Sequence, residues 1–164
     1  MTPYHVRMPE AGSAAPDADL LRLVALDAED LAVLSAHCQD AVLKVADLRW
    51  MRAEKRFLVP MNRFVWEAAG EGSWRKRNYQ RRRSALHFAR VERVQSSAID
   101  RAGRDTVLDL LSIRFEPRDE PSGDVVLYFA GDATVRLKVE CLEAQLADLG
   151  PAWSTPHAPR HLLR

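Results

Sequence analysis

The sequence has few cysteines, no long apolar run and no biased tract, and each absence removes a class of protein. Only Cys38 and Cys141 occur among 164 residues. The chain is therefore not a small disulfide-stapled scaffold, and we expect two buried free thiols. No apolar run approaches the roughly 18 residues that span a bilayer. Residues 1–19 contain no apolar segment of the signal-peptide kind, so we expect a cytoplasmic protein without membrane contact.

The sequence also lacks the patterns of cofactor binding, metal binding and catalysis. Gly70 and Gly72 stand outside the strand-to-helix context that makes a phosphate-binding loop. His157 and His161 are separated by Pro159, which disfavours the helix that would bring both to one metal ion. No serine-centred elbow, Cys/His signature or paired-carboxylate motif is present. We therefore expect no cofactor and no metal, and an enzyme is the least favoured interpretation.

What the sequence does contain is the composition of one ordinary globular domain. Hydrophobic residues make up 47% of the chain and charged residues 29%, which suffices for a sizeable core. Prolines and small residues in 1–19 predict a disordered arm. Residues 20–151 are expected to form a single α+β domain, and 152–164 a flexible tail.

The clearest fold signal runs from Asp124 to Pro151. Two stretches of period-two alternation flank the turn dipeptide Gly131-Asp132, which predicts a pair of adjacent strands. The spacing of Leu142, Leu146 and Leu149 then predicts a closing helix that Gly150-Pro151 ends. Acidic Glu140 and Glu143 suit the start of such a helix.

Upstream, the pattern predicts a strand, a helix and then a β-rich region. Leu20–Leu26 is the expected first strand, and Asp27 is a good N-cap for a helix over Ala28–Val42. Further strands are expected over Val45–Met51, Arg56–Glu67, Arg83–Ser96 and Thr106–Phe115. Arg52–Lys55 is a plausible hairpin connection, and Pro60 suggests an edge position or a bulge.

These elements predict an α+β fold. We expect a curved antiparallel sheet or a small partly open barrel of about seven strands, with one helix after the first strand and a C-terminal helix. A terminal helix on such a meander resembles pleckstrin-homology-like barrels. That is an analogy of architecture and carries no function.

Several phrases spread over residues 20–153 are similar to one bacterial family. They are Leu21-Arg22-Leu23, Glu29-Asp30-Leu31, Gln39-Asp40-Ala41-Val42, Asn62-Arg63-Phe64, Trp66-Glu67, Arg83-Ser84-Ala85-Leu86, Val139-Glu140-Cys141-Leu142-Glu143, Leu149-Gly150-Pro151 and Trp153. On these residues the chain resembles domain of unknown function family 2948, seen mostly in alphaproteobacteria. The resemblance implies a cytoplasmic bacterial protein and brings no established activity.

The net charge of +1 hides a strong asymmetry. Residues 44–104 hold sixteen Lys or Arg against six Asp or Glu, a balance of +10, and the rest holds eight against seventeen, a balance of −9. The most basic stretch also carries aromatics that suit stacking on bases. Its candidate polyanion-binding residues are Trp74, Arg75, Lys76, Arg77, Tyr79, Arg81, Arg82 and Arg83. A solvated loop that pairs with the acidic half explains the same residues, and both interpretations stay open.

A second cluster lies in and after the expected Arg56–Glu67 strand. Asn62, Arg63, Trp66 and His87 combine polar and aromatic side chains that could line the mouth of a pocket. Cross-strand contacts and a structural histidine are the simpler interpretations.

The sequence therefore favours a small non-enzymatic binding or regulatory module that acts through an unknown protein partner or through self-association. The alternative is binding of single-stranded nucleic acid or another polyanion through residues 74–83.

Overall fold

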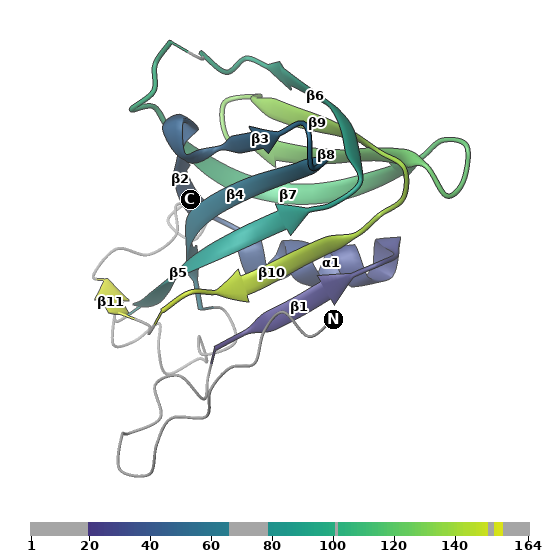
Figure 1. The fold of residues 1–164 in the computed structure, drawn as a ribbon. Coiled ribbons are helices and arrows are strands. Elements are labelled where there is room, and N and C mark those ends of the chain that lie inside the picture. The colour runs from purple at the N-terminus through teal and green to yellow at the C-terminus, as the bar shows by residue number, and fades with distance from the viewer. Residues whose placement is uncertain (1–19, 66–78, 101, 151–152, 156–164) are drawn as a thin grey trace.

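The computed structural model describes residues 20–65, 79–100, 102–150 and 153–155, which form a strongly curved antiparallel sheet with one α-helix against it (Figure 1). The helix is α1 (Ala28–Cys38), and a short 3-10 helix, η2, spans Val45–Asp47. The strands are β1 (Arg22–Ala25), β2 (Ala41–Lys44), β3 (Arg49–Met51), β4 (Arg56–Phe64), β5 (Tyr79–Phe88), β6 (Val91–Ser97), β7 (Val107–Pro117), β8 (Gly123–Phe129), β9 (Thr134–Val139), β10 (Ala144–Asp148) and β11 (Trp153–Thr155).

The strand order is β1-β10-β5-β4-β2-β7-β8-β9-β6, with β3 added to β4 and β11 added to β5. The sheet curves so far that β3 and β6 approach each other without pairing, so the barrel is open along this line. Helix α1 packs against β1, β4 and β7. The predicted curved sheet, open rather than closed, and the helix after the first strand are therefore confirmed, although the described strands number eleven rather than about seven.

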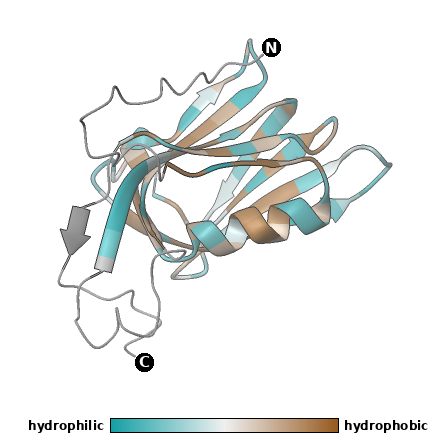
Figure 2. Ribbon diagram, turned by 90° about the horizontal axis from the view of Figure 1, so that it is seen from below, coloured by the Kyte–Doolittle hydropathy of each residue, from teal (hydrophilic) through white to brown (hydrophobic). Residues whose placement is uncertain are grey.

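Period-two alternation builds the core. Val135, Leu137 and Val139 of β9 point inward, and Leu127 of β8 and Leu110 of β7 lie buried beside them. Figure 2 shows this alternation of apolar and polar residues along the strands. Most strands bury one face, and β8 buries both. Where only one face is buried, the pattern also determines the register of pairing.

Four local predictions are confirmed. The backbone N–H of Asp30 donates to Asp27 Oδ1 at 2.8 Å, which is the N-cap bond of α1. Gly131 and Asp132 adopt positive φ values of 80° and 60° in the turn between β8 and β9. The hairpin at 52–55 forms, and Pro60 lies between the parts of β4 that pair with β3 and with β2, where that ladder is interrupted.

The predicted C-terminal helix is wrong, because Ala144–Asp148 is the strand β10, paired with both β1 and β5. Leu142 and Leu146 satisfy a period of two as well as a period near four, and Leu149 lies exposed at 60%. Glu140 and Glu143 consequently do not start a helix. Glu140 instead pairs with Lys55 at 2.6 Å. Without this helix the described residues lack the feature on which the pleckstrin-homology analogy depended.

Smaller boundaries also differ. Helix α1 ends at Cys38 because Asp40 adopts a positive φ of 63°, so Val42 belongs to β2. The expected Val45–Met51 strand is η2 followed by β3. The expected Arg83–Ser96 strand divides at Arg90, which has a φ of 60°. There the chain leaves the β4 side of the sheet and joins β9.

Other predictions fall partly outside the described residues. Residues 1–19 are outside them, so the disordered arm stays a prediction. The flexible tail over 152–164 also stays a prediction, since only Trp153–Thr155 of it is described, as strand β11 paired with β5. The described residues contain no helix with the length and apolar character needed to cross a membrane.

Candidate functional site

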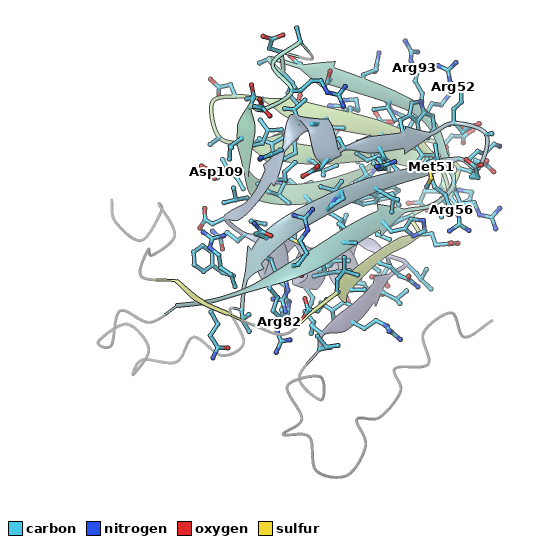
Figure 3. The ribbon with its side chains drawn as sticks, turned by 60° about the vertical axis from the view of Figure 1, so that its left-hand side comes forward. Met51, Arg52, Arg56, Arg82, Arg93 and Asp109 are labelled. Carbon is cyan, nitrogen blue, oxygen red and sulfur yellow. The ribbon has the colours of Figure 1, made fainter. Side chains whose placement is uncertain are left out.

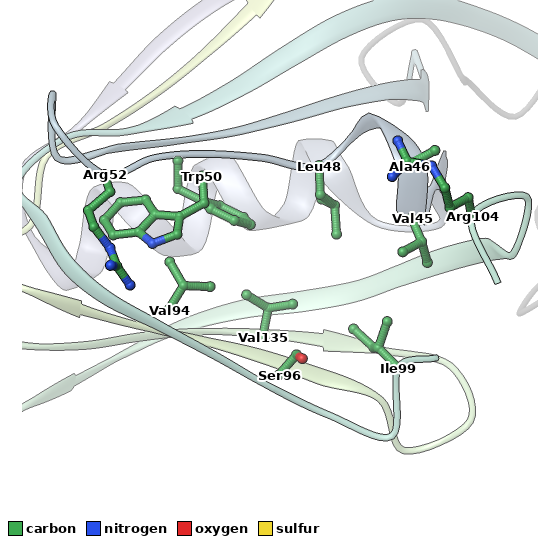
Figure 4. A pocket seen from close by; sticks show the side chains of 11 residues that line it. Val45, Ala46, Leu48, Trp50, Arg52, Val94, Ser96, Ile99, Arg104 and Val135 are labelled. Carbon is green, nitrogen blue, oxygen red and sulfur yellow. The ribbon is translucent and has the colours of Figure 1, made fainter. Parts of the chain in front are cut away.

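The line along which the barrel stays open forms a cleft of about 390 Å³, which we call the slot (Figure 4). One wall comes from η2, β3 and the residues around them, and the other from β6, β9 and the loop after β6. The slot is lined by Val45, Ala46, Leu48, Trp50, Arg52, Phe57, Val94, Ser96, Ile99, Arg104 and Val135. Its volume is within the range of about 300–1,000 Å³ that is usual for small-molecule sites.

Main-chain hydrogen bonds join the two walls at or beyond each end of the slot. Beyond one end, Val91 N donates to Lys55 O at 2.8 Å. At the other end, Val45 N and Ala46 N donate to the carbonyl oxygens of Thr106 and Arg104 at 3.0 and 3.1 Å. The slot is therefore a cleft of limited length, closed at both ends by these main-chain hydrogen bonds.

The floor of the slot is the hydrophobic core itself. Phe57 and Val135 are 3% and 2% exposed, and Leu48, Trp50 and Val94 are half-buried against them. Trp50 lies opposite the buried Phe57 in the β3–β4 ladder, so its indole faces inward. Among the described strands, β3 pairs with β4 alone, and its other edge borders the slot. Any apolar group that entered the slot would contact these half-buried side chains, which favours binding by the removal of water.

The charge of the slot is of one sign. Arg52 and Arg104 lie at its opposite ends (Figure 4), and none of the lining residues is acidic. Among the described residues, no carboxylate makes an ion pair with either guanidinium. The slot thus combines an apolar floor with two cationic ends.

The residues of the basic stretch have different positions. Trp74, Arg75, Lys76 and Arg77 lie outside the described residues, and Tyr79 begins β5. Arg82 is 3% exposed and donates to Gly150 O at 3.1 Å, far from Arg52 and Arg93 (Figure 3). The use of this stretch as a binding surface stays a prediction.

The two neighbours of Arg82 in β5 also contact the fold. The Arg81 guanidinium lies 3.7 Å from the centroid of the Phe64 ring, a cation–π contact. Burial lowers the pKa of Arg81, and the charge of Asp109 opposes this shift. Arg83 donates to Asn62 Oδ1 at 3.3 Å and approaches Asp47 at 3.7 Å. Phe64, Asn62 and Asp47 themselves lie within residues 44–104, so pairing of the basic stretch with the acidic half of the chain stays a prediction.

The members of the second predicted cluster face different sides of the sheet. Asn62 and His87 lie on the outward face, and Arg63 points inward from β4 with no exposed surface. Arg56 Nη1 lies 3.2 Å from His87 Nε2. Because a guanidinium group only donates hydrogen bonds, His87 Nε2 is the acceptor. Trp66 lies outside the described residues, so the pocket-mouth hypothesis remains a prediction.

Arg63 belongs to a buried polar cluster that sequence reasoning missed. Its Nε and Nη2 donate to the two oxygens of Asp148 at 2.7 and 2.8 Å, and neither side chain has exposed surface. Ser84 Oγ and Leu21 N also donate to this carboxylate, at 2.6 and 2.8 Å. The sequence did contain a signal for this cluster, because Asp148 continues the alternation of the inward residues Ala144 and Leu146. The signal was missed because this segment was predicted to be a helix.

The described residues offer no set of three His, Cys, Asp or Glu side chains that could hold a metal ion. Both cysteines are free, Cys38 buried and Cys141 half-buried. Burial raises the pKa of the Cys38 thiol to about 12, which makes it a poor nucleophile and a packing residue.

Sequence reasoning also missed the residues of the slot. Trp50 and Arg52 are more than forty positions from Val94 and Arg104, and no local pattern indicates that these segments meet.

Comparison with known proteins identifies one family. A family model described as "Protein of unknown function (DUF2948)" matches residues 21–161. No curated protein matches the chain, and no solved structure matches it.

Proposed function

Because the chain belongs to the DUF2948 family, whose description assigns no activity, we propose its function from the slot: a small non-enzymatic module that binds a compact, apolar anion. The bound molecule has an apolar body that covers the floor around Trp50 and Val135. It has a carboxylate or a similar group that meets Arg52 or Arg104. The observation that carries this proposal is the cleft of half-buried apolar side chains, Leu48, Trp50 and Val94, between two guanidinium groups.

The lining residues favour binding over catalysis. Ser96 supplies the one hydroxyl of the lining, and no histidine, cysteine or carboxylate stands beside it to act as a general base. Two arginines can hold an anion through charge-assisted hydrogen bonds but do not transfer protons at neutral pH.

The shape of the slot favours a compact ligand over a polypeptide. A peptide strand that added to β3 or β6 would meet the main-chain hydrogen bonds at or beyond each end. A protein partner or self-association, which the sequence analysis favoured, therefore stays a separate hypothesis that the slot does not explain. Polyanion binding through residues 74–83 stays the alternative.

The proposal is tested with decanoate and with decanol, which share an apolar chain and differ in charge. Calorimetry on the full chain should show saturable decanoate binding and weaker decanol binding. Replacing Arg52 and Arg104 together by Ala should weaken decanoate binding about tenfold or more, since each charge-assisted contact contributes about 1.5–3 kcal/mol. Decanol binding should change little.

Matched variants locate the site. Arg49→Ala removes one exposed cation from β3 outside the slot and should leave decanoate binding unchanged. Val94→Glu places a carboxylate on the apolar wall and should abolish it. Absence of saturable binding, or equal losses in the Arg49 and Arg52/Arg104 variants, would refute the proposal.

A further inference from the structure

A second hollow, of about 280 Å³, lies on the outward face of β6, β8 and β9. It is lined by Arg93, Gln95, Arg118, Asp124, Arg136 and Lys138. The alternation of β6 separates it from the slot, since Val94 and Ser96 face the slot and Arg93 and Gln95 face outward. We call it the basic hollow.

Two cations of the basic hollow face each other directly. Arg93 of β6 is the register partner of Lys138 of β9, and like charges at such a position are destabilising. Neither side chain makes an ion pair with any described residue. Lys138 is also opposite Asp124 of β8, but that carboxylate makes its ion pairs with Arg118 and Arg136. This repulsion is relieved if an anion lies between the two cations.

The other two cations are held in fixed positions. Asp124 Oδ2 accepts from Arg118 Nη2 and from Arg136 Nη1, each at 2.8 Å, and Asp124 is 4% exposed. Arg136 Nη1 also contacts Glu116 Oε1 at 2.8 Å. Burial alone would raise the pKa of Asp124, but the hydrogen bonds from the two arginines outweigh it and keep the carboxylate ionised. Asp124 is the one carboxylate of the lining, and Glu116 pairs with Arg136 beside it, so four cations less these two carboxylates leave a net charge of +2.

We propose that the basic hollow binds a compact, multiply charged phosphate or pyrophosphate group, a function separate from that of the slot. Arg93 and Lys138 supply direct charge, Arg118 and Arg136 supply guanidinium N–H groups with fixed orientation, and the Gln95 amide adds a neutral donor. The net positive charge of the hollow attracts such a multiply charged anion.

Acidic neighbours favour a small ligand over a nucleic-acid strand. Glu92 directly precedes Arg93, and Asp119 and Glu120 directly follow Arg118, and all three acids are exposed. A phosphate backbone that extended beyond the hollow along these segments would meet like charge. A single phosphate or pyrophosphate group avoids it.

The test uses inorganic pyrophosphate and calorimetry on the full chain at low ionic strength. Wild-type protein should bind it saturably. The double variant Arg93→Ala/Lys138→Ala should bind about tenfold or more weakly. A control, Lys44→Ala/Arg49→Ala, removes the same charge from exposed positions on β2 and β3 and should stay within about twofold of wild type.

Three further measurements make the test decisive. Urea unfolding should show that both double variants remain folded, and decanoate binding should be the same in both, so that failure of one proposal leaves the other intact. No saturable pyrophosphate binding, or equal losses in the two variants, overturns the proposal. Tighter binding of a short oligothymidylate than of pyrophosphate, lost in Arg93→Ala/Lys138→Ala, also overturns it in favour of a nucleic-acid surface.

Discussion

Removal of the Asp148 carboxylate should be among the most destabilising single changes in this protein. Asp148→Ala leaves the Arg63 guanidinium, which has no exposed surface, without its charged partner. It also removes the acceptor for Ser84 Oγ and for Leu21 N. The guanidinium cannot lose its proton at any ordinary pH, so the uncompensated charge stays buried.

The expected loss follows from these contacts. Breaking a buried ion pair by removing one partner costs about 3–5 kcal/mol. The two additional donors that lose their acceptor place Asp148→Ala toward the upper end of that range. Because the whole domain is expected to be stable by about 5–15 kcal/mol, the variant should be close to unfolding.

Urea unfolding monitored by circular dichroism measures the loss, and a double variant reveals its cause. Arg63→Met/Asp148→Leu removes the two-point ion pair and keeps apolar volume, whereas Arg82, whose Nε lies 3.7 Å from Asp148, stays charged in both variants. The double variant should therefore be about 2 kcal/mol more stable than Asp148→Ala. If the double variant is as unstable as Asp148→Ala, the stability comes from packing and the argument from charge is refuted. A loss below about 1 kcal/mol in Asp148→Ala would refute it as well.

The same site predicts a pH dependence. Burial alone would raise the pKa of Asp148, but the hydrogen bonds that the carboxylate accepts outweigh it and hold the pKa below its ordinary value. Its contribution to the free energy of unfolding is therefore complete above the unfolded pKa, near 3.9, and is lost as the pH falls through the folded pKa. The double variant should lack this part of the acid sensitivity.

Two further predictions concern single side chains. Cys38 should resist iodoacetamide in the native protein while the half-buried Cys141 reacts, because burial raises the Cys38 pKa to about 12; mass spectrometry of the labelled peptides checks this, and equal labelling contradicts it. Burial and the Arg56 guanidinium lower the pKa of His87, and Glu143 opposes them, so NMR titration should show a higher pKa in Arg56→Ala and a lower one in Glu143→Gln. The depressed pKa means that the His87 contribution to stability is complete above about pH 6.5 and is lost below it.

Local sequence patterns correctly predicted the elements that are stabilised by contacts between residues close together in the sequence. The N-cap bond of Asp27 spans three residues, and the Gly131-Asp132 turn joins strands that pair with each other. In both cases the interacting groups lie within a few positions, so their chemistry is visible in the sequence.

The error at β10 has a non-local cause. Leu142, Leu146 and Leu149 fit a helix, but β1 and β5 both supply hydrogen-bonding partners to Ala144–Asp148. Pairing on both edges, together with the buried bond from Arg63 to Asp148, outweighs a local helical preference. The helix prediction failed because it considered only the segment itself.

The sequence by itself determined that this chain is an antiparallel sheet with a helix after its first strand, because alternation, capping and turn residues act over short distances. The tertiary structure alone decided the functional surfaces. The slot brings Trp50 and Arg52 opposite Val94, and the basic hollow combines side chains from β6, β8 and β9 with Arg118. Both depend on how far the sheet curves, and curvature comes from the packing of the whole core rather than from any one segment.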